Sequence, residues 1–226
     1  MNDTKIGFVG LGNVGSKLAN NILKKGYILY VHDLNEKSAN DLVSKGAIFC
    51  KSLDTLVTNV TVLITCLPSP ESVRNVLLEC LPNIKKKDLW IEMSTTDEEE
   101  MKSLSNLVLP HFQAHKNGSI INIASVEALT PGFGLGIYST SKAAILMLTK
   151  NQAKEWGQYG VKANAICPGL IKTKFSAALW TNEKMLHKLE KSIPSGRMGM
   201  PEEKVGLACL LASDAGNYMT GGVYTA

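Results

Sequence analysis

The chain has 226 residues and a formal net charge of +4, a size that fits one α/β domain with a substantial core. The basic run at 85–87 has no aromatic residues between its lysines, so we expect no nucleic-acid partner. No apolar run reaches about 18 residues, so no membrane span is expected either.

Cysteine and histidine usage gives no sign of a metal site or of a disulfide framework. The five cysteines are odd in number and far apart: Cys50, Cys66, Cys80, Cys167 and Cys209. No Cys-x-x-Cys pair or Cys/His cluster is present, so we expect no bound metal. Free thiols and an N-terminus without a signal-peptide pattern favour a cytoplasmic location.

A strand expected at Lys5–Val9 runs into a glycine-rich turn and then into a helix expected at Ser16–Lys25. The turn consists of Gly10, Leu11, Gly12, Asn13, Val14 and Gly15. In a G-x-G-x-x-G turn the first glycine allows the bend, the second lets backbone approach a pyrophosphate, and the third permits close packing of helix on strand. The strand before and the helix after make this a predicted dinucleotide-binding unit.

The next strand, expected at Tyr27–His32, ends at Asp33. A carboxylate about 20 residues after the glycines would bond the ribose hydroxyls of NAD and repel the 2′-phosphate of NADP. We therefore expect NAD rather than NADP. Asp33 as the N-cap of a helix that starts near Asn35 is the competing interpretation.

Further apolar strands alternate with helices along the rest of this half. Strands are expected at 46–50, 60–67 and 88–93, and helices at 54–59, 71–80 and 97–115. Continuous apolar strands separated by helices are typical of a parallel sheet that is covered on both faces. The fold class is therefore α/β, with one doubly wound Rossmann-type sheet of about seven or eight strands.

Residues 5 to about 105 resemble the nucleotide-binding domain of the β-hydroxyacid dehydrogenases, the 3-hydroxyisobutyrate dehydrogenase group. The segments IGFVGLGNVGSKLANNILKKGY, VHDLNEKS, TCLPSPESV and IEMSTT carry the resemblance. It implies that Leu67 and Pro68 border the adenosine and that Ser94 and Thr95 touch a substrate carboxylate. A hydroxyl that caps the next helix is the alternative for Ser94.

In the second half, Tyr138 and Lys142 stand four apart, which places them on one face of a helix. An ammonium there stabilises a phenolate, and such a phenol can exchange a proton while a nicotinamide exchanges a hydride. An apolar strand at 119–124 ends in Ser125, thirteen residues before Tyr138. A second apolar strand, from Val161, ends in a Pro-Gly turn.

These motifs, with RMGMP and the segment after it, resemble the C-terminal half of the short-chain dehydrogenase/reductase family over about residues 107–226. The resemblance implies that Ser125 holds the substrate oxygen, that Tyr138 is the acid/base, and that Lys142 tunes Tyr138 and binds ribose. Pro168, Gly169 and Thr173 would flank the nicotinamide. We expect 175–189 to form a helical lid, with Trp180 shaping the substrate pocket.

The chain thus combines a dinucleotide-binding half, 1–105, with a short-chain-type catalytic half, 106–226, expected to share one Rossmann-type domain. In the short-chain family the serine-bearing strand is the fifth, whereas here the first half already supplies five strands. An added strand would displace Tyr138 by about 4.8 Å across the sheet, which we expect to impair hydride transfer unless a strand is dropped.

The predicted function is an NAD-dependent oxidoreductase that interconverts an alcohol and a carbonyl on a small-molecule substrate. One alternative is a dinucleotide-binding protein with little turnover. Another is a remnant 3-hydroxyacid dehydrogenase without its helical domain. The short-chain resemblance also implies a homo-oligomer formed through the helices expected at 97–115 and 138–157.

Overall fold

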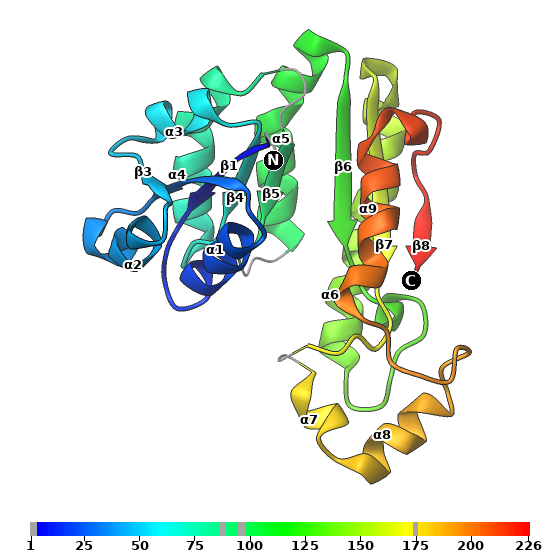
Figure 1. Ribbon diagram of the computed structural model, residues 1–226. Coiled ribbons are helices and arrows are strands. Elements are labelled where there is room, and N and C mark those ends of the chain that lie inside the picture. The colour runs from blue at the N-terminus through cyan, green and yellow to red at the C-terminus, as the bar shows by residue number, and fades with distance from the viewer. Residues whose placement is uncertain (1–3, 86–88, 95–97, 174–175) are drawn as a thin grey trace. The chain divides into compact units, whose positions relative to one another are not determined.

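The computed structural model describes residues 4–85, 89–94, 98–173 and 176–226 (Figure 1). The chain divides into two compact units, Met1–His111 and Phe112–Ala226. Each unit contains its own parallel sheet, and each is described here by itself.

The first unit alternates strands with helices, as the sequence predicts. Its strands are β1 (Lys5–Val9), β2 (Ile28–His32), β3 (Ile48–Phe49), β4 (Val62–Thr65) and β5 (Leu89–Glu92). Its helices are α1 (Gly15–Lys24), α2 (Asn40–Ser44), α3 (Leu53–Asn59), α4 (Pro70–Cys80) and α5 (Glu98–His115), with short 3-10 turns η1 (Glu36–Ala39) and η2 (Leu81–Asn83).

The five strands are all parallel and lie in the order β3-β2-β1-β4-β5. The order reverses between β1 and β4, because β2 and β3 follow β1 on one side and β4 lies on its other side. Ligands of open α/β sheets bind at the carboxyl ends of the strands beside such a reversal. The glycine-rich turn follows β1 at this point.

Alternate residues of these strands face two apolar layers. Phe8 and Val31 pack in one buried cluster with residues of α1 and α2. Val9 and Leu63 pack in another with residues of α3 and α4. Since successive side chains of a strand point to opposite faces, helices cover both faces of this sheet.

Two helices of the first unit begin at serine caps that the sequence places after strands. The Ser52 hydroxyl accepts from the Thr55 N–H at the start of α3. The Ser69 hydroxyl accepts from the Ser72 N–H, with Pro70 in the first helical position of α4. Each cap satisfies an N–H that the first turn of a helix leaves without a partner.

The second unit has the strands β6 (Gly118–Ile123), β7 (Val161–Cys167) and β8 (Val223–Thr225), parallel and in that order. Its helices are α6 (Gly136–Trp156), α7 (Ala177–Trp180), α8 (Glu183–Glu190) and α9 (Val205–Ala212). Short 3-10 turns are η3 (Val126–Ala128), η4 (Gly157–Tyr159), η5 (Pro201–Lys204) and η6 (Asp214–Gly216).

Helices α6 and α9 lie on opposite faces of this sheet. The buried Asn122 of β6 donates to Thr149 of α6, over 2.9 Å. Ser119 of the same strand donates to the Leu211 carbonyl of α9, also over 2.9 Å. These strand residues are three apart, so their side chains point to opposite faces. Helix α6 therefore packs on one face of the sheet and α9 on the other.

The expected single sheet is corrected by the pairing of the strands. The α/β class and the parallel strands are as predicted, but the described strands form a sheet of five and a sheet of three. The first half is complete in itself, because β5 pairs with β4 from Val62↔Leu89 to Thr65↔Glu92. The β4 edge where a serine-bearing strand would pair in the short-chain family is therefore filled.

Helix α5, Glu98–His115, matches the helix expected across the junction of the two halves and contains Pro110. The division between the compact units falls within it, after His111. In the part of the chain that the structure describes, no helix is both long and apolar enough to cross a membrane, and no group of three potential metal ligands occurs.

Candidate active site

The three glycines of the turn after β1 have the three roles that a dinucleotide cradle requires. Gly10 has a φ of 94°, and a Cβ there would lie 2.3 Å from the Cys66 carbonyl oxygen. A Cβ on Gly15 would lie 1.9 Å from the Gly10 carbonyl oxygen, so α1 starts in close contact with the turn. A Cβ on Gly12 would meet nothing within 4 Å. The space above Gly12 is thus open to a ligand.

The helix that follows the turn begins without an anionic partner of its own. Val14 is the N-cap of α1 and provides no side-chain cap, and the first turn has no acidic residue. The N-terminal N–H groups of a helix attract phosphate through hydrogen bonds and the helix dipole. Leu11, Asn13 and Val14 lie where the sequence predicts them, and Asn13 and Val14 are exposed.

Asp33, directly after β2, holds the glycine-rich turn in place. Its Oδ2 accepts from the Leu11 N–H over 2.7 Å, and its Oδ1 accepts from the Asn35 N–H over 2.8 Å. The competing interpretation of Asp33 as a helix N-cap is wrong, because the N-cap of η1 is Asn35, and the bond from the Asn35 N–H to Asp33 is an Asx turn ahead of that helix. A carboxylate has about four acceptor sites, so two remain for ribose hydroxyls.

The loops after β4 and β5 are tied together by Ser94. The Ser94 hydroxyl accepts from the Leu67 N–H over 2.7 Å, and the Ser94 N–H donates to Glu92. Ser94 thus links two strand ends and still has a hydroxyl proton to donate. Pro68 is exposed beside Leu67, at the same carboxyl edge of the sheet. Thr95 lies outside the described residues.

In the second unit, Ser125 follows β6 and caps η3. It is only 8% exposed, and its hydroxyl oxygen accepts from the Glu127 N–H over 3.2 Å. Because a backbone donor occupies one lone pair, the hydroxyl proton is free to point at a bound carbonyl oxygen.

Tyr138 and Lys142 lie one turn apart on α6, as their spacing predicts. The Lys142 Nζ lies 5.9 Å from the centre of the Tyr138 ring and donates to the Ile123 carbonyl over 3.1 Å. Burial lowers the pKa of Lys142 from its ordinary 10.5. Tyr138 stays 37% exposed, so its ring is accessible to a bound molecule.

Cys167, at the end of β7, connects Ser125 with Lys142. The Ser125 backbone N–H donates to the Cys167 sulfur, and Lys142 interacts with the same sulfur electrostatically. Burial raises the pKa of the Cys167 thiol, while the Ser125 N–H and the Lys142 ammonium act in the opposite sense. The Lys142 ammonium also bonds the Ile123 carbonyl, two residues before Ser125, so Tyr138 and Lys142 lie near the end of β6.

The Pro-Gly turn after β7 lies beside η3. The Pro168 carbonyl accepts from the Val126 N–H over 3.1 Å, next to Ser125 in the chain. A Cβ on Gly169 would meet nothing within 4 Å, so this turn is open on one side. The turn therefore lies beside Ser125.

Trp180, at the end of α7, folds back on the loop that carries Thr173. Its indole N–H donates to the Thr173 carbonyl over 3.0 Å, and Lys172 lies over its ring at 5.2 Å. The expected lid consists of two helices, α7 and α8, and neither has a fully buried residue. Phe175, where the lid was expected to begin, lies outside the described residues. Trp180 thus fixes the loop after β7.

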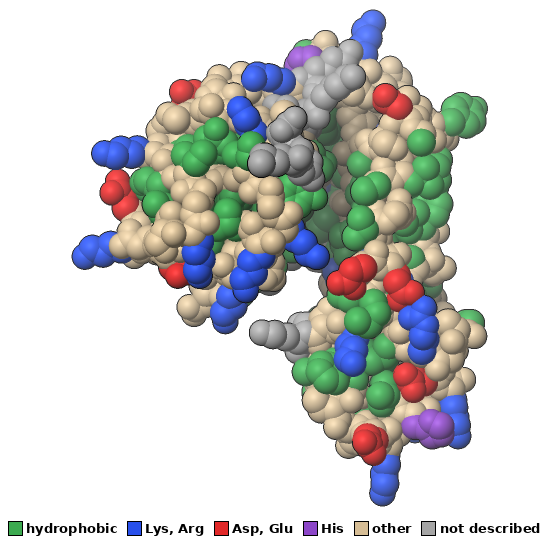
Figure 2. All heavy atoms as spheres, in the orientation of Figure 1, with side chains coloured by type: hydrophobic (Ala, Val, Ile, Leu, Met, Phe, Trp, Pro, Cys, Tyr) green, Lys and Arg blue, Asp and Glu red, His purple; other side chains and the backbone are tan. Residues whose placement is uncertain are grey.

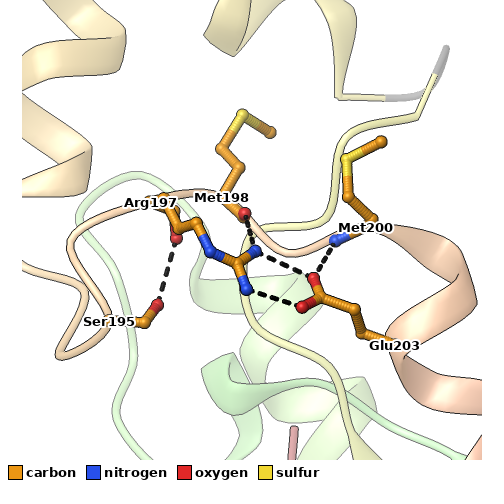
Figure 3. Close-up of polar contacts among 5 residues, drawn as sticks. All are labelled: Ser195, Arg197, Met198, Met200 and Glu203. Carbon is orange, nitrogen blue, oxygen red and sulfur yellow. Dashed lines mark hydrogen bonds and ion pairs between the residues drawn. The ribbon is translucent and has the colours of Figure 1, made fainter.

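An ion pair clamps the segment RMGMP (Figure 3). Both Arg197 terminal nitrogens bond the Glu203 carboxylate, at 2.6 and 2.9 Å, and the Met200 N–H donates to it over 2.7 Å. Gly199, which lies between Arg197 and Glu203 in the chain, forms an isolated parallel β-bridge with Ile171. The clamp therefore supports the loop after β7. The sequence displays the motif, but its role as a clamp was not predicted.

The clamp is expected to open in acid. The hydrogen bonds from Arg197 and from the Met200 N–H lower the pKa of Glu203 to about 2 from an ordinary 4.5. A carboxylate with a lowered pKa stabilises the fold above its unfolded pKa and loses that effect as the pH falls through its folded pKa. The protection factor of the Met200 amide, which is its intrinsic exchange rate divided by the observed rate at each pH, should therefore fall between about pH 4.5 and pH 2. Glu203→Ala, which removes the acceptor, should show the low protection already at pH 6, and unchanged protection there would contradict the clamp.

Comparisons with known proteins match the two halves of the chain to two different families of dehydrogenases and reductases. Residues 86–226 match the family model described as enoyl-(acyl carrier protein) reductase, and residues 5–110 match the NAD-binding domain of 6-phosphogluconate dehydrogenase. The first match covers more than half of the chain. The chain therefore belongs to the short-chain dehydrogenase/reductase family, with an N-terminal half of another dehydrogenase type, as the two resemblances predicted.

Individual relatives match part of the chain. Dehydrogenase/reductase SDR family member 4 of Oryctolagus cuniculus is 34% identical over 135 residues, which are 60% of this chain and 52% of the relative. Gluconate 5-dehydrogenase of Gluconobacter oxydans is 32% identical over 143 residues, 63% and 56% of the two chains. The chain thus spans about half the length of these relatives.

Solved structures resemble the whole chain. A putative NAD(P)-dependent gluconate 5-dehydrogenase from Beutenbergia cavernae, with bound NADP, is 25% identical with a TM-score of 0.60, and covers 98% of this chain and 94% of its own. A putative gluconate dehydrogenase from Agrobacterium tumefaciens is 20% identical with a TM-score of 0.62, covers 100% and 94%, and supports the fold alone.

Proposed function

We propose that this chain is an NAD-dependent oxidoreductase of short-chain type that interconverts an alcohol and a carbonyl. The observation that carries the proposal is the placement of Lys142 one turn after Tyr138 on α6, with its ammonium bonded to the Ile123 carbonyl, two residues before Ser125. Membership of the family supports the reaction class.

The residues of the first unit fit a dinucleotide. Gly10, Gly12 and Gly15 leave the space and the exposed helix end that a pyrophosphate needs, and Asp33 has acceptor sites left for ribose. Asp33 is our reason for preferring NAD to NADP, because a carboxylate repels a 2′-phosphate. When bound, the nicotinamide supplies or accepts the hydride.

The residues of the second unit would manage the substrate oxygen and its proton. Ser125 donates its free hydroxyl proton to that oxygen, and Tyr138 gives or takes the proton of the alcohol. The Lys142 ammonium favours the phenolate form of Tyr138. Pro168, Gly169 and Thr173 border the nicotinamide side, and Trp180 limits the pocket through its bond to the Thr173 carbonyl.

Two measurements on the wild-type chain test the proposal. Titration with NAD in a calorimeter measures binding, and absorbance at the wavelength of NADH measures turnover across a panel of secondary alcohols and polyols. We expect NAD binding and oxidation of at least one alcohol class. Binding without turnover would favour a dinucleotide-binding protein, the alternative that the self-contained sheet of the first unit supports.

A third candidate function is that of a 3-hydroxyacid dehydrogenase that lacks its helical domain, and the hydroxyl of Ser94 is the feature that favours it. Its hydroxyl proton is available at the carboxyl edge of the first sheet, while its oxygen accepts from Leu67. If this function held, turnover would require a substrate carboxylate and would be lost in Ser94→Ala. Turnover of uncharged alcohols by that variant would exclude it.

The NAD preference gives a prediction for Asp33. Asp33→Ala should raise the Kd for NAD about tenfold and leave the Kd for NADP unchanged or lower, which is measured by titration with each. Loss of an acceptor for the Leu11 and Asn35 N–H groups should also cost about 2 kcal/mol of stability. Asp41→Ala, which removes an exposed carboxylate on α2, is the control. An unchanged NAD/NADP ratio would refute the assignment.

We also propose that the chain forms a homo-oligomer through α5 and α6. On α6, Ile137 is 92% exposed and Met147 is 58% exposed, as expected for a face that packs on another copy. Apolar side chains also show on the face of the second unit that carries α9 (Figure 2). Sedimentation equilibrium measures the oligomeric state. We expect an oligomer for the wild type and a weaker one for Met147→Lys, and an unchanged oligomer in the variant would argue against a contact through α6.

A further inference from the structure

Glu127 lies in η3, between the two predicted catalytic residues in the chain, and bonds to both sides. Its carboxylate accepts from the Gly132 N–H and, over 3.4 Å, from the Ser139 hydroxyl. Its own N–H donates to the Ser125 hydroxyl over 3.2 Å. One residue thus joins the group that would hold the substrate oxygen to the helix that carries Tyr138.

The start of α6 has few local supports of its own. Its N-cap, Leu135, provides no side-chain hydrogen bond, and its first turn has no acidic residue. The Glu127 carboxylate supports this end from outside the helix, because it accepts from the Ser139 hydroxyl and brings a negative charge near the positive end of the helix dipole. Ser139 is 5% exposed, so this contact is largely shielded from water.

Gly132 fits the same arrangement. A Cβ at this position would lie 2.9 Å from the Glu127 Oε2, so a larger residue here would require the carboxylate to shift. The loop from Ser125 to the start of α6 is therefore closed on itself by one side chain.

We infer that Glu127 is a positioning residue for the proposed reaction, on which this inference rests. It acts through Ser125 and Tyr138 by fixing η3, which aims the N–H at the Ser125 hydroxyl, and by fixing the first turn of α6. A displacement of about 1 Å at such groups costs about a hundredfold in rate. A carboxamide has one acceptor oxygen in the same place and should restore most of this function.

The test compares Glu127→Ala, Glu127→Gln and Glu155→Ala, an exposed position on α6 with the same loss of charge. We expect Glu127→Ala to lower kcat by about ten- to a hundredfold with the KM for NAD unchanged. We expect Glu127→Gln to retain kcat within about threefold, and Glu155→Ala to match the wild type. A wild-type kcat in Glu127→Ala, or equal losses in Ala and Gln, would overturn the inference.

A second measurement separates this inference from the proposed function. Amide exchange followed by NMR should show the Gly132 and Glu127 N–H groups protected in the wild type and in Glu127→Gln. Both should exchange rapidly in Glu127→Ala. If the wild type has no turnover, the proposed function fails, and this exchange pattern still decides whether Glu127 holds the loop. Equal protection in Glu127→Ala would overturn the positioning role by itself.

Discussion

Replacing Tyr138 with Phe is expected to lower kcat for alcohol oxidation by about a thousandfold, within the usual range for loss of a general acid/base. The substitution removes only the phenol oxygen. The ring remains beside Lys142, whose Nζ lies 5.9 Å from its centre. The Kd for NAD should stay within about twofold, because the glycine cradle belongs to the first unit. Steady-state kinetics and calorimetric titration measure the two effects.

Tyr218→Phe is the matched control, since it removes the same hydroxyl from a fully exposed ring. It should leave both kcat and NAD affinity unchanged. If Tyr138→Phe retained the turnover of the wild type, proton transfer would belong to another group and the assignment would be wrong. If the wild type binds NAD but turns over very slowly, the expected impairment of the hybrid architecture would gain support.

Glycine-to-alanine substitutions at two positions of the glycine-rich turn are expected to have the second large effect, one on NAD affinity and the other on stability. Gly12→Ala should keep the fold, because its Cβ meets nothing within 4 Å, yet should weaken NAD binding by about a hundredfold by filling the space for the pyrophosphate. Gly15→Ala should instead lower the free energy of unfolding by about 3 kcal/mol, because its Cβ would lie 1.9 Å from the Gly10 carbonyl oxygen.

Urea denaturation and NAD titration of both variants measure these outcomes. Gly206→Ala is a suitable control, since a Cβ there meets nothing within 4 Å and the position is remote from the cradle in sequence. A stable Gly12→Ala variant with wild-type affinity would show that the turn holds no pyrophosphate.

Much of the fold could be predicted from sequence because local patterns and tertiary packing agree. Strand β1, Lys5–Val9, was predicted to the residue, and α5 to within one. The division of the strands into two sheets could not be predicted, because an apolar strand pattern indicates burial but not the edge with which the strand pairs. The strand count of the two halves led instead to the expectation of one sheet with an added strand.

In the candidate site, too, features set by nearby residues could be predicted, whereas contacts between distant segments could not. The spacing of Tyr138 and Lys142 and the end of a strand at Ser125 are visible in the sequence. The roles of Cys167 and Glu127 depend on contacts between segments that no periodicity displays. The sequence predicted Cys167 only as a small buried thiol in an apolar strand. The only available signal for Glu127 was a charged residue two positions after a strand-terminal serine.

Asp33 has a consequence for attempts to retune cofactor choice. The carboxylate that would discriminate between the two nucleotides also anchors the Leu11 N–H, over 2.7 Å, and so holds the loop that cradles the phosphates. A redesign that simply exchanges Asp33 for a small or basic residue would loosen the loop while it gains room for the extra phosphate. A successful redesign must introduce a new acceptor for that amide together with the new basic group.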